Sequence, residues 1–331
     1  MINLRGIFNP GVYHGPGRGQ NFFEGWYYKI ADKEGENVCA IIPAIYINKN
    51  DEERSHSFIQ LHMNNKQKPF YHKFPREAFT ADRKKFEVEI GDNYFSRNKI
   101  KLDIDNHIQK LDGELKFTQL KPWPVKLLSP GAMGWYAYMP FMECYHGVLS
   151  FDHEIEGQLC IDGNSYDFSE GRGYLEKDWG ESFPQAWVWL QCNHFKESGT
   201  SLFASLAMVP WRGRELRGYI IGLHREGKFY TFTTYNRATL DFAKIKSNRI
   251  KMKLSKGKYQ LQIEAAADDW VELIGPYRES MKQNVRETLG AEISVILEDK
   301  KQGEELFAGH SNKAGLEING DLVKLNSAPG K

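Results

Sequence analysis

Short runs with β-branched or aromatic apolar residues, separated by polar turn-forming residues, extend along almost the whole chain. In the first half they are Val38 to Ile47, Ser57 to Met63, Phe86 to Ile90, Ile100 to Ile104, Gly113 to Phe117, Gly147 to Ile155, Gln158 to Ile161 and Asn164 to Phe168. In the second half they are Ser201 to Val209, Tyr219 to His224, Lys228 to Thr234, Ile250 to Leu254, Tyr259 to Ala265 and Glu292 to Leu297. Their β-branched and aromatic content predicts strands.

Two local signals add to this pattern. Asp162-Gly163, between two such runs, predicts a tight hairpin turn. Pro276 to Leu289 is the best candidate for a short helix, because Pro begins it and Gly290 ends it, although its apolar spacing is poor. The chain is therefore predicted to be all-β, with antiparallel barrels or sandwiches and few helices.

The length of the chain predicts two domains. Its 331 residues are about twice the usual size of a single domain. Aromatic openings recur at Phe22 to Lys29 and Phe183 to Phe195, each followed by a set of strands, which indicates a weak internal duplication. We expect an N-terminal domain over residues 1–172 and a C-terminal domain over 173–331.

The composition excludes some partners. The chain has 44 Lys and Arg against 43 Asp and Glu, so it lacks the basic surplus that nucleic-acid binding needs. It has no apolar leader with a cleavage site and no uncharged run near membrane-spanning length. We expect a cytoplasmic protein that can make transient contact with a membrane surface. The sequence leaves the oligomeric state open.

No metal site is predicted. The four cysteines are far apart, without the paired spacing of zinc or redox sites: Cys39, Cys144, Cys160 and Cys192. His56 and His62 share one face of a predicted strand, but six residues at about 3.3 Å each place them roughly 20 Å apart. That distance is too long for both to bind one ion.

The segment from Gly173 to Phe195 combines a charged cluster with an aromatic strand. Alternation along the strand places one set of side chains on one face: Trp187, Trp189, Gln191, Asn193 and Phe195. Val188, Leu190, Cys192 and His194 lie on the other face. Both faces are too apolar for water, so we expect one of them to line a cavity, with ordinary core packing as the alternative.

Two long, aromatic-rich motifs stand out: Tyr174 to Gly180 with Phe183-Pro184 and Trp187 to Asn193, and Phe22 to Lys29. The first resembles the signature of the tocopherol cyclase family, and the second resembles that family's opening motif. Further matching pieces are Pro140 to Glu143, Gly163 to Phe168, Arg286 to Leu297 and Ala314 to Gly320. The resemblance covers nearly the whole chain and implies two lipocalin-like (calycin) antiparallel β-barrel domains packed together. Small barrels of this kind can hold one apolar ligand.

The resemblance also implies a reaction. In it a prenylated hydroquinone closes a chromanol ring without a cofactor. An acid must protonate the alkene nearest the ring, the resulting cation must be shielded from water, and the phenol oxygen must be held against it. Indole faces can stabilise a cation, and side-chain amides can orient the phenol groups.

Buried carboxyl groups are the candidates for the acid, because burial keeps a carboxylic acid protonated at neutral pH. Glu176 is the preferred one, because Asp178 stands where many cyclases are expected to carry Asn. The candidate catalytic residues are Glu24, Glu176, Lys177 and Asp178. The candidate substrate-binding residues are Trp26, Tyr28, Glu143, Trp179, Trp187, Trp189, Gln191 and Asn193.

Three other interpretations remain. The charged run could be a solvated turn between the domains. The protein could be a carrier of a quinol, carotenoid or other isoprenoid lipid that does no chemistry, since function belongs to the site rather than the fold. It could also be a hydratase or cyclase of a different polyene. In each of the two functional alternatives the expected partner is an apolar isoprenoid small molecule, which the sequence does not identify.

Overall fold

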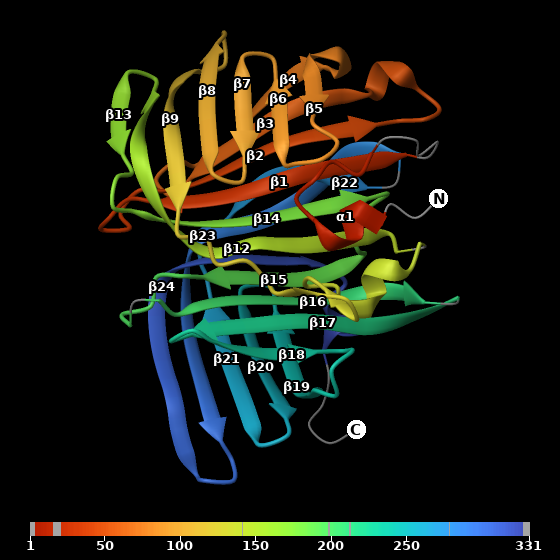
Figure 1. The fold of residues 1–331 in the computed structure, drawn as a ribbon, viewed down its shortest axis with the longest axis vertical. Helices are drawn as coiled ribbons and strands as arrows, with labels where there is room; N and C mark the ends of the chain where they lie inside the picture. Colours follow the sequence, from red (N-terminus) through yellow and green to blue (C-terminus); the bar gives the residue numbers. More distant parts are fainter. Residues whose placement is uncertain are drawn as a thin grey trace. The chain divides into compact units, whose positions relative to one another are not determined.

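The computed structural model describes residues 4–15, 21–140, 142–197, 199–211, 213–277 and 279–326. Over this part of the chain nearly all regular structure is β-strand, and the strands pair antiparallel (Figure 1). The prediction of an all-β, antiparallel protein is therefore confirmed. Closure of the sheets into barrels stays a prediction. The helices are short: α1 (Leu4–Phe8), α2 (Leu322–Leu325) and 3₁₀ turns at Glu52–Arg54, Arg76–Ala78 and Gly134–Tyr138.

The chain divides into two compact units. The first unit contains residues 1–183 and 273–284, and the second contains 184–272 and 285–331. The boundary expected between residues 172 and 173 falls inside a strand of the first unit, β14 (Arg172–Gly180). The charged half of the central motif thus belongs to the first unit and its aromatic half to the second.

A twelve-stranded sheet runs through the first unit in the order β4-β3-β2-β1-β14-β12-β9-β8-β7-β6-β5, with β13 paired to β12. Its strands are β1 (Phe22–Ala31), β2 (Val38–Ile47), β3 (His56–Met63), β4 (Phe70–Pro75), β5 (Phe79–Ala81), β6 (Glu87–Ile90), β7 (Asn93–Ser96), β8 (Lys99–Asp105), β9 (Lys110–Thr118), β12 (Cys144–Ile161), β13 (Asn164–Asp167) and β14. A separate hairpin joins β10 (Val125–Lys126) to β11 (Ser129–Pro130).

A second sheet, of ten strands, lies mainly in the second unit. Its strand order is β18-β17-β16-β15-β24-β23-β21-β20-β19, with β22 paired to β23. Its strands are β15 (Ala186–Cys192), β16 (Ser201–Trp211), β17 (Arg214–Arg225), β18 (Lys228–Thr233), β19 (Thr239–Lys246), β20 (Arg249–Lys256), β21 (Tyr259–Ala266), β22 (Val271–Tyr277), β23 (Ser280–Asp299) and β24 (Glu304–Gly320).

The two sheets have the same order of connections. In each, a strand from an aromatic motif opens a meander of four, β1 to β4 and β15 to β18. That opening strand then pairs on its other side with a strand much later in the sequence, β14 or β24. The shared topology supports the internal duplication suggested by the sequence.

The helix predicted over Pro276 to Leu289 is wrong. Pro276 lies in β22, and residues 280–299 form the long strand β23. From Val285 onward, buried and more exposed positions largely alternate along β23, as expected for a strand with one face in the core. The hairpin turn at Asp162-Gly163 is confirmed, because both residues have positive φ, as a two-residue turn of this type requires.

Each unit has its own hydrophobic core. That of the first unit includes Trp26, Tyr28 and Leu175, and that of the second includes Val188 and Leu190. Among the described residues, no helix is long and apolar enough to cross a bilayer.

Candidate active site

The charged motif forms the strand β14, whose two faces carry different groups. Alternation places Tyr174, Glu176 and Asp178 on one face and Leu175, Lys177 and Trp179 on the other. Leu175 belongs to the core of the first unit, so we call its side the core face of β14 and the other its polar face. Nearly all of β14 is buried, so the charged run is no solvated turn.

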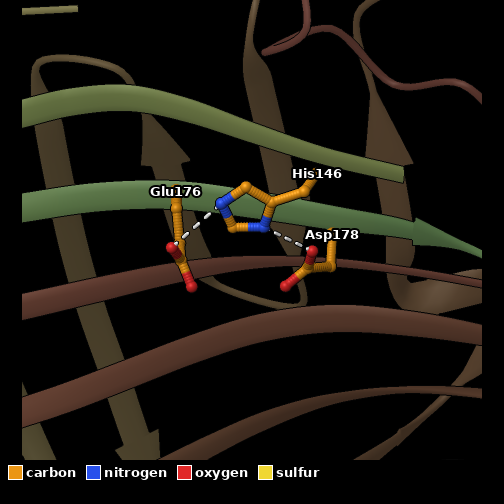
Figure 2. A group of neighbouring side chains, drawn as sticks. All are labelled: His146, Glu176 and Asp178. Atoms are coloured by element: carbon orange, nitrogen blue, oxygen red, sulfur yellow. Dashed lines mark hydrogen bonds and ion pairs between the residues drawn. The ribbon is translucent and has the colours of Figure 1, made fainter. Parts of the chain in front are cut away.

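On the polar face, an imidazole lies between two carboxylates (Figure 2). The register of β12 against β14 sets His146 directly opposite Asp178. His146 Nδ1 is 2.7 Å from Asp178 Oδ1, and its Nε2 is 3.3 Å from Glu176 Oε2. Tyr174 donates its hydroxyl proton to the same Glu176 oxygen. Two hydrogen bonds and one ion pair thus connect the four side chains, which we call the proton cluster.

The proton cluster is buried at one end and accessible at the other. The Glu176 side chain is only 4% exposed, that of His146 is 13% exposed and that of Asp178 is 26% exposed. Gly25 of β1 pairs with Asp178 across the sheet and has no side chain to cover it. Asp178 is therefore the member of the cluster that is most accessible to solvent.

The environment holds protons on this cluster. Burial alone would lower the pKa of His146, but the carboxylates of Asp178 and Glu176 outweigh it and raise that pKa to about 10. Burial raises the pKa of the Glu176 carboxyl, against the opposing effect of His146. His146 is therefore an imidazolium at neutral pH, and Glu176 holds a proton more readily than an ordinary carboxyl group. Such a cluster can donate a proton to a buried substrate.

Three of these residues are also of the types that bind metal ions. One atom each of His146, Glu176 and Asp178 lie within 4.8 Å of one another. However, the two ring nitrogens of His146 face different carboxylates, and a metal ligand must be neutral imidazole. With a pKa of about 10, His146 would have to give up its proton first. The arrangement fits an ion-paired proton store better than a metal site.

On the core face of β14, Lys177 forms an ion pair with Glu24 of β1 rather than with Asp178. Both side chains are completely buried. The Lys177 ammonium also donates to the backbone carbonyl of Val12 and to His14 Nδ1, the latter over 2.7 Å. The backbone N–H of His14 donates to both Glu24 oxygens over 2.9 Å. This network ties the N-terminal segment to β1 and β14.

Two indoles enclose the Lys177 ammonium. It lies 4.9 Å from the ring centre of Trp26 and 4.8 Å from that of Trp179. Trp179 stacks on His14 with ring centres 4.2 Å apart, and Trp26 stacks on Phe86 at 5.3 Å. The indole faces on this side are therefore already in contact with protein groups.

The pKa values of Lys177 and Glu24 on the core face are lowered, whereas those of His146 and Glu176 in the proton cluster are raised. Burial lowers the pKa of Lys177 to about 8, although Glu24 opposes this. Burial would raise the pKa of Glu24, but the Lys177 ammonium and His14 together hold it below its usual value. Glu24 is thus a carboxylate at neutral pH, which suits an ion-pair partner and not an acid.

The other candidate residues are spread over both units. Tyr28 lies in the core of the first unit and donates its hydroxyl proton to the Ser96 carbonyl over 2.7 Å. Glu143 immediately precedes β12, and its backbone carbonyl accepts from Glu181. The remaining candidates lie on or next to β15 of the second unit: Trp187, Trp189, Gln191 and Asn193. Of these, Trp187 donates its indole N–H to Glu317 over 2.5 Å.

His146, Tyr174 and His14 were not predicted as site residues from the sequence. Tyr174 could have been found, because it is two residues before Glu176 and so shares its face of any strand. His146 and His14 could not, because their positions depend on which strand or segment packs against β14.

The sequence matches one family model and two plant proteins. A family model described as tocopherol cyclase-like matches residues 105–320. A probable chloroplastic tocopherol cyclase of Oryza sativa subsp. japonica is 27% identical over 201 residues, which are 56% of this chain and 42% of that protein. The chloroplastic tocopherol cyclase of Zea mays is 27% identical over 206 residues, 59% of this chain and 43% of that protein. The match therefore spans less than half the length of these plant proteins.

Solved structures show the same fold at low sequence identity. A putative AttH from Nitrosomonas europaea aligns with a TM-score of 0.55 and 15% identity over 93% of this chain and 94% of its own. CghA with Sch210972 aligns with a TM-score of 0.56 and 9% identity, over 91% of this chain and 89% of its own. Kievitone hydratase from Nectria haematococca aligns with a TM-score of 0.52 and 15% identity, over 94% of this chain and 93% of its own. Because the family model covers most of the chain, this protein belongs to the tocopherol cyclase-like family.

Proposed function

We propose that this protein is an enzyme that closes a chromanol ring on a prenylated hydroquinone by proton transfer, without a cofactor. The observation that supports this most is the proton cluster, in which a buried carboxyl of raised pKa contacts an imidazolium and a tyrosine hydroxyl. Family membership supports the same reaction class.

Glu176 is the proposed acid. Its proton passes to the CH carbon of the trisubstituted alkene nearest the ring, which breaks the C=C π bond and leaves a tertiary cation. The phenol oxygen then bonds to the cation and releases its proton to a carboxylate of the cluster, so no net proton is consumed. His146 and Tyr174 hold the Glu176 carboxylate in place once the proton has left.

Asp178 has a separate proposed role. Its carboxylate is 2.7 Å from His146 Nδ1 and fixes the imidazolium beside Glu176. Because Asp178 is the most exposed member of the cluster, we place the phenol of the substrate nearest to it. Trp187, Trp189, Gln191 and Asn193 stay proposed substrate-binding residues, and Trp26 and Trp179 are assigned to Lys177 instead.

Hydration of an alkene is the second candidate function. The exposure of Asp178 would let water reach the cation, and the product would then be a tertiary alcohol. If the protein is instead a carrier, it should bind the isoprenoid ligand without converting it to a product.

The experiment is to incubate the purified protein with a panel of prenylated hydroquinones and separate the products by chromatography with mass detection. Ring closure gives a product of unchanged mass and new retention, whereas hydration adds the mass of water. Glu176→Gln keeps the shape and removes the proton, so it should lower turnover by roughly a hundredfold or more while ligand affinity changes little.

The matched control is Glu170→Gln, which makes the same substitution at a side chain that is 68% exposed. It should leave turnover unchanged. Normal turnover in Glu176→Gln, with a lower melting temperature, would show that Glu176 is structural. Ligand binding without any product from the wild type would favour the carrier.

A further inference from the structure

The tip of the β10–β11 hairpin is apolar and exposed. Lys126 pairs with Ser129, so Leu127 and Leu128 form the two-residue loop between the strands. Leu127 is 73% exposed and Leu128 is 83% exposed. Apart from Val323 on α2, no large apolar side chain among the described residues is as exposed as these two.

Turn chemistry does not account for these leucines. Two-residue hairpin loops favour Asn, Gly and Asp, which adopt positive φ easily and interact well with water. Neither Leu127 nor Leu128 has positive φ. Two adjacent leucines at such a tip lose the benefit of burial and gain nothing for the turn, which indicates that the tip has a partner outside the chain.

Aromatic side chains lie next to the tip. The Tyr138 hydroxyl donates to the backbone carbonyl of Leu127, which joins the Gly134–Tyr138 turn to the hairpin. In this turn, Trp135 is 39% exposed and stacks on Tyr136 with ring centres 4.1 Å apart. The Phe8 ring of α1 lies 6.2 Å from that of Tyr138. We define the hairpin patch as Phe8, Val125, Leu127, Leu128 and Trp135, which are all exposed apolar side chains.

The segment that contains most of the hairpin patch carries only basic charges. No Asp or Glu occurs between Glu114 and Glu143, although acidic residues make up 43 of the 331. Lys126 is exposed at the base of the tip. Lys121 is half-buried and paired with Asp152 of β12. A surface with exposed leucines, an exposed tryptophan and lysine but no nearby acid in its sequence complements an anionic lipid surface.

We propose that the hairpin patch docks this protein on anionic lipid bilayers, with Leu127 and Leu128 inserted among the lipids and Lys126 at the headgroups. A second copy of the chain fits less well, because two leucines offer far less than the roughly 800 Å² per partner that a stable protein interface buries. This proposal does not depend on the chemistry of the proton cluster.

The test is co-sedimentation of the full chain with vesicles of phosphatidylcholine alone and of phosphatidylcholine mixed with phosphatidylglycerol. The wild type should sediment with the mixed vesicles. The double variant Leu127→Ser/Leu128→Ser should bind at least roughly tenfold more weakly, since each leucine loses its transfer into an apolar medium. Lys126→Glu should lose roughly fivefold, on the anionic vesicles only.

The matched control is Val323→Ser, which removes an equally exposed apolar side chain that is 82% exposed on α2. It should bind like the wild type. The proposal is overturned if the wild type stays in the supernatant or if the double variant binds as well as the wild type. A dimer that depends on Leu127 and Leu128, found by sedimentation velocity together with no vesicle binding, would assign the patch to a second copy instead.

Discussion

Replacing Lys177 by Met should strongly destabilise the first unit. The methionine keeps an unbranched apolar side chain in the space between Trp26 and Trp179 but removes the ammonium. Glu24 then remains completely buried without its cation, although the His14 backbone N–H still donates to it. The variant therefore separates the charge of Lys177 from the volume of its side chain.

The size of the effect follows from these contacts. Breaking a buried ion pair by removing one partner costs about 3–5 kcal/mol. The loss of two cation–π contacts adds about 1 kcal/mol. In a unit of roughly two hundred residues, where each kcal/mol shifts the melting temperature by about 2–4 °C, the decrease should be roughly 10–20 °C.

The effect should depend on pH with a defined sign. In the wild type the pKa of Glu24 is lowered, so its contribution to stability is present above its unfolded pKa and is lost as the pH falls through the folded one. In Lys177→Met, burial without the ammonium favours the protonated Glu24. The difference in stability between the two proteins should therefore shrink as the pH falls.

The assay is thermal and urea denaturation followed by circular dichroism. Lys33→Met, at a surface ion pair whose lysine is 58% exposed, is the matched control and should leave the melting temperature unchanged. In the double variant Lys177→Met/Glu24→Gln the loss should be smaller than the two single losses added together. A melting temperature of Lys177→Met close to that of the wild type, or full additivity in the double variant, would refute the reasoning.

Three further predictions concern the proton cluster. Asp178→Asn should lower the pKa of His146 from about 10, because the substitution removes the nearer of two carboxylates. Titration of the imidazole nitrogens followed by NMR measures this pKa. Since the pKa of His146 is raised, its contribution to stability should be complete below its unfolded value of about 6.5 and lost as the pH rises through about 10. Denaturation of wild type and His146→Gln across this range tests that sign. A chelator such as EDTA should leave turnover unchanged, because the ring nitrogens of His146 face carboxylates; activity restored by added zinc after chelation would argue for a metal.

Local pattern was sufficient for much of the fold. β-branched and aromatic content between turn residues identified most of the strands, and Asp162-Gly163 identified a hairpin correctly, because these signals act within a few residues. Pro276 to Leu289 was assigned wrongly because Pro and Gly were given more weight than its poor apolar spacing. In the structure Glu287 and Thr288 of that segment pair with β24, a contact with a later part of the chain.

For the candidate site, too, local sequence pattern did not reveal contacts between distant parts of the chain. Glu176 and Asp178 share a face because they are two residues apart, which the sequence alone implies. The sequence cannot tell that His146 pairs opposite Asp178, or that Lys177 turns to Glu24 on the other face. Trp26 and Trp187 were both candidate substrate-binding residues, but they lie in different units.

The central claim is that the proton cluster starts the reaction by protonating an alkene. The most direct test is to run the reaction in D₂O and examine the product by mass spectrometry and NMR. The account predicts one deuterium per chromanol, on the ring carbon next to the new C–O carbon, as a single stereoisomer. A chromanol without deuterium at that carbon, or with deuterium in both orientations equally, would contradict proton transfer from a fixed Glu176.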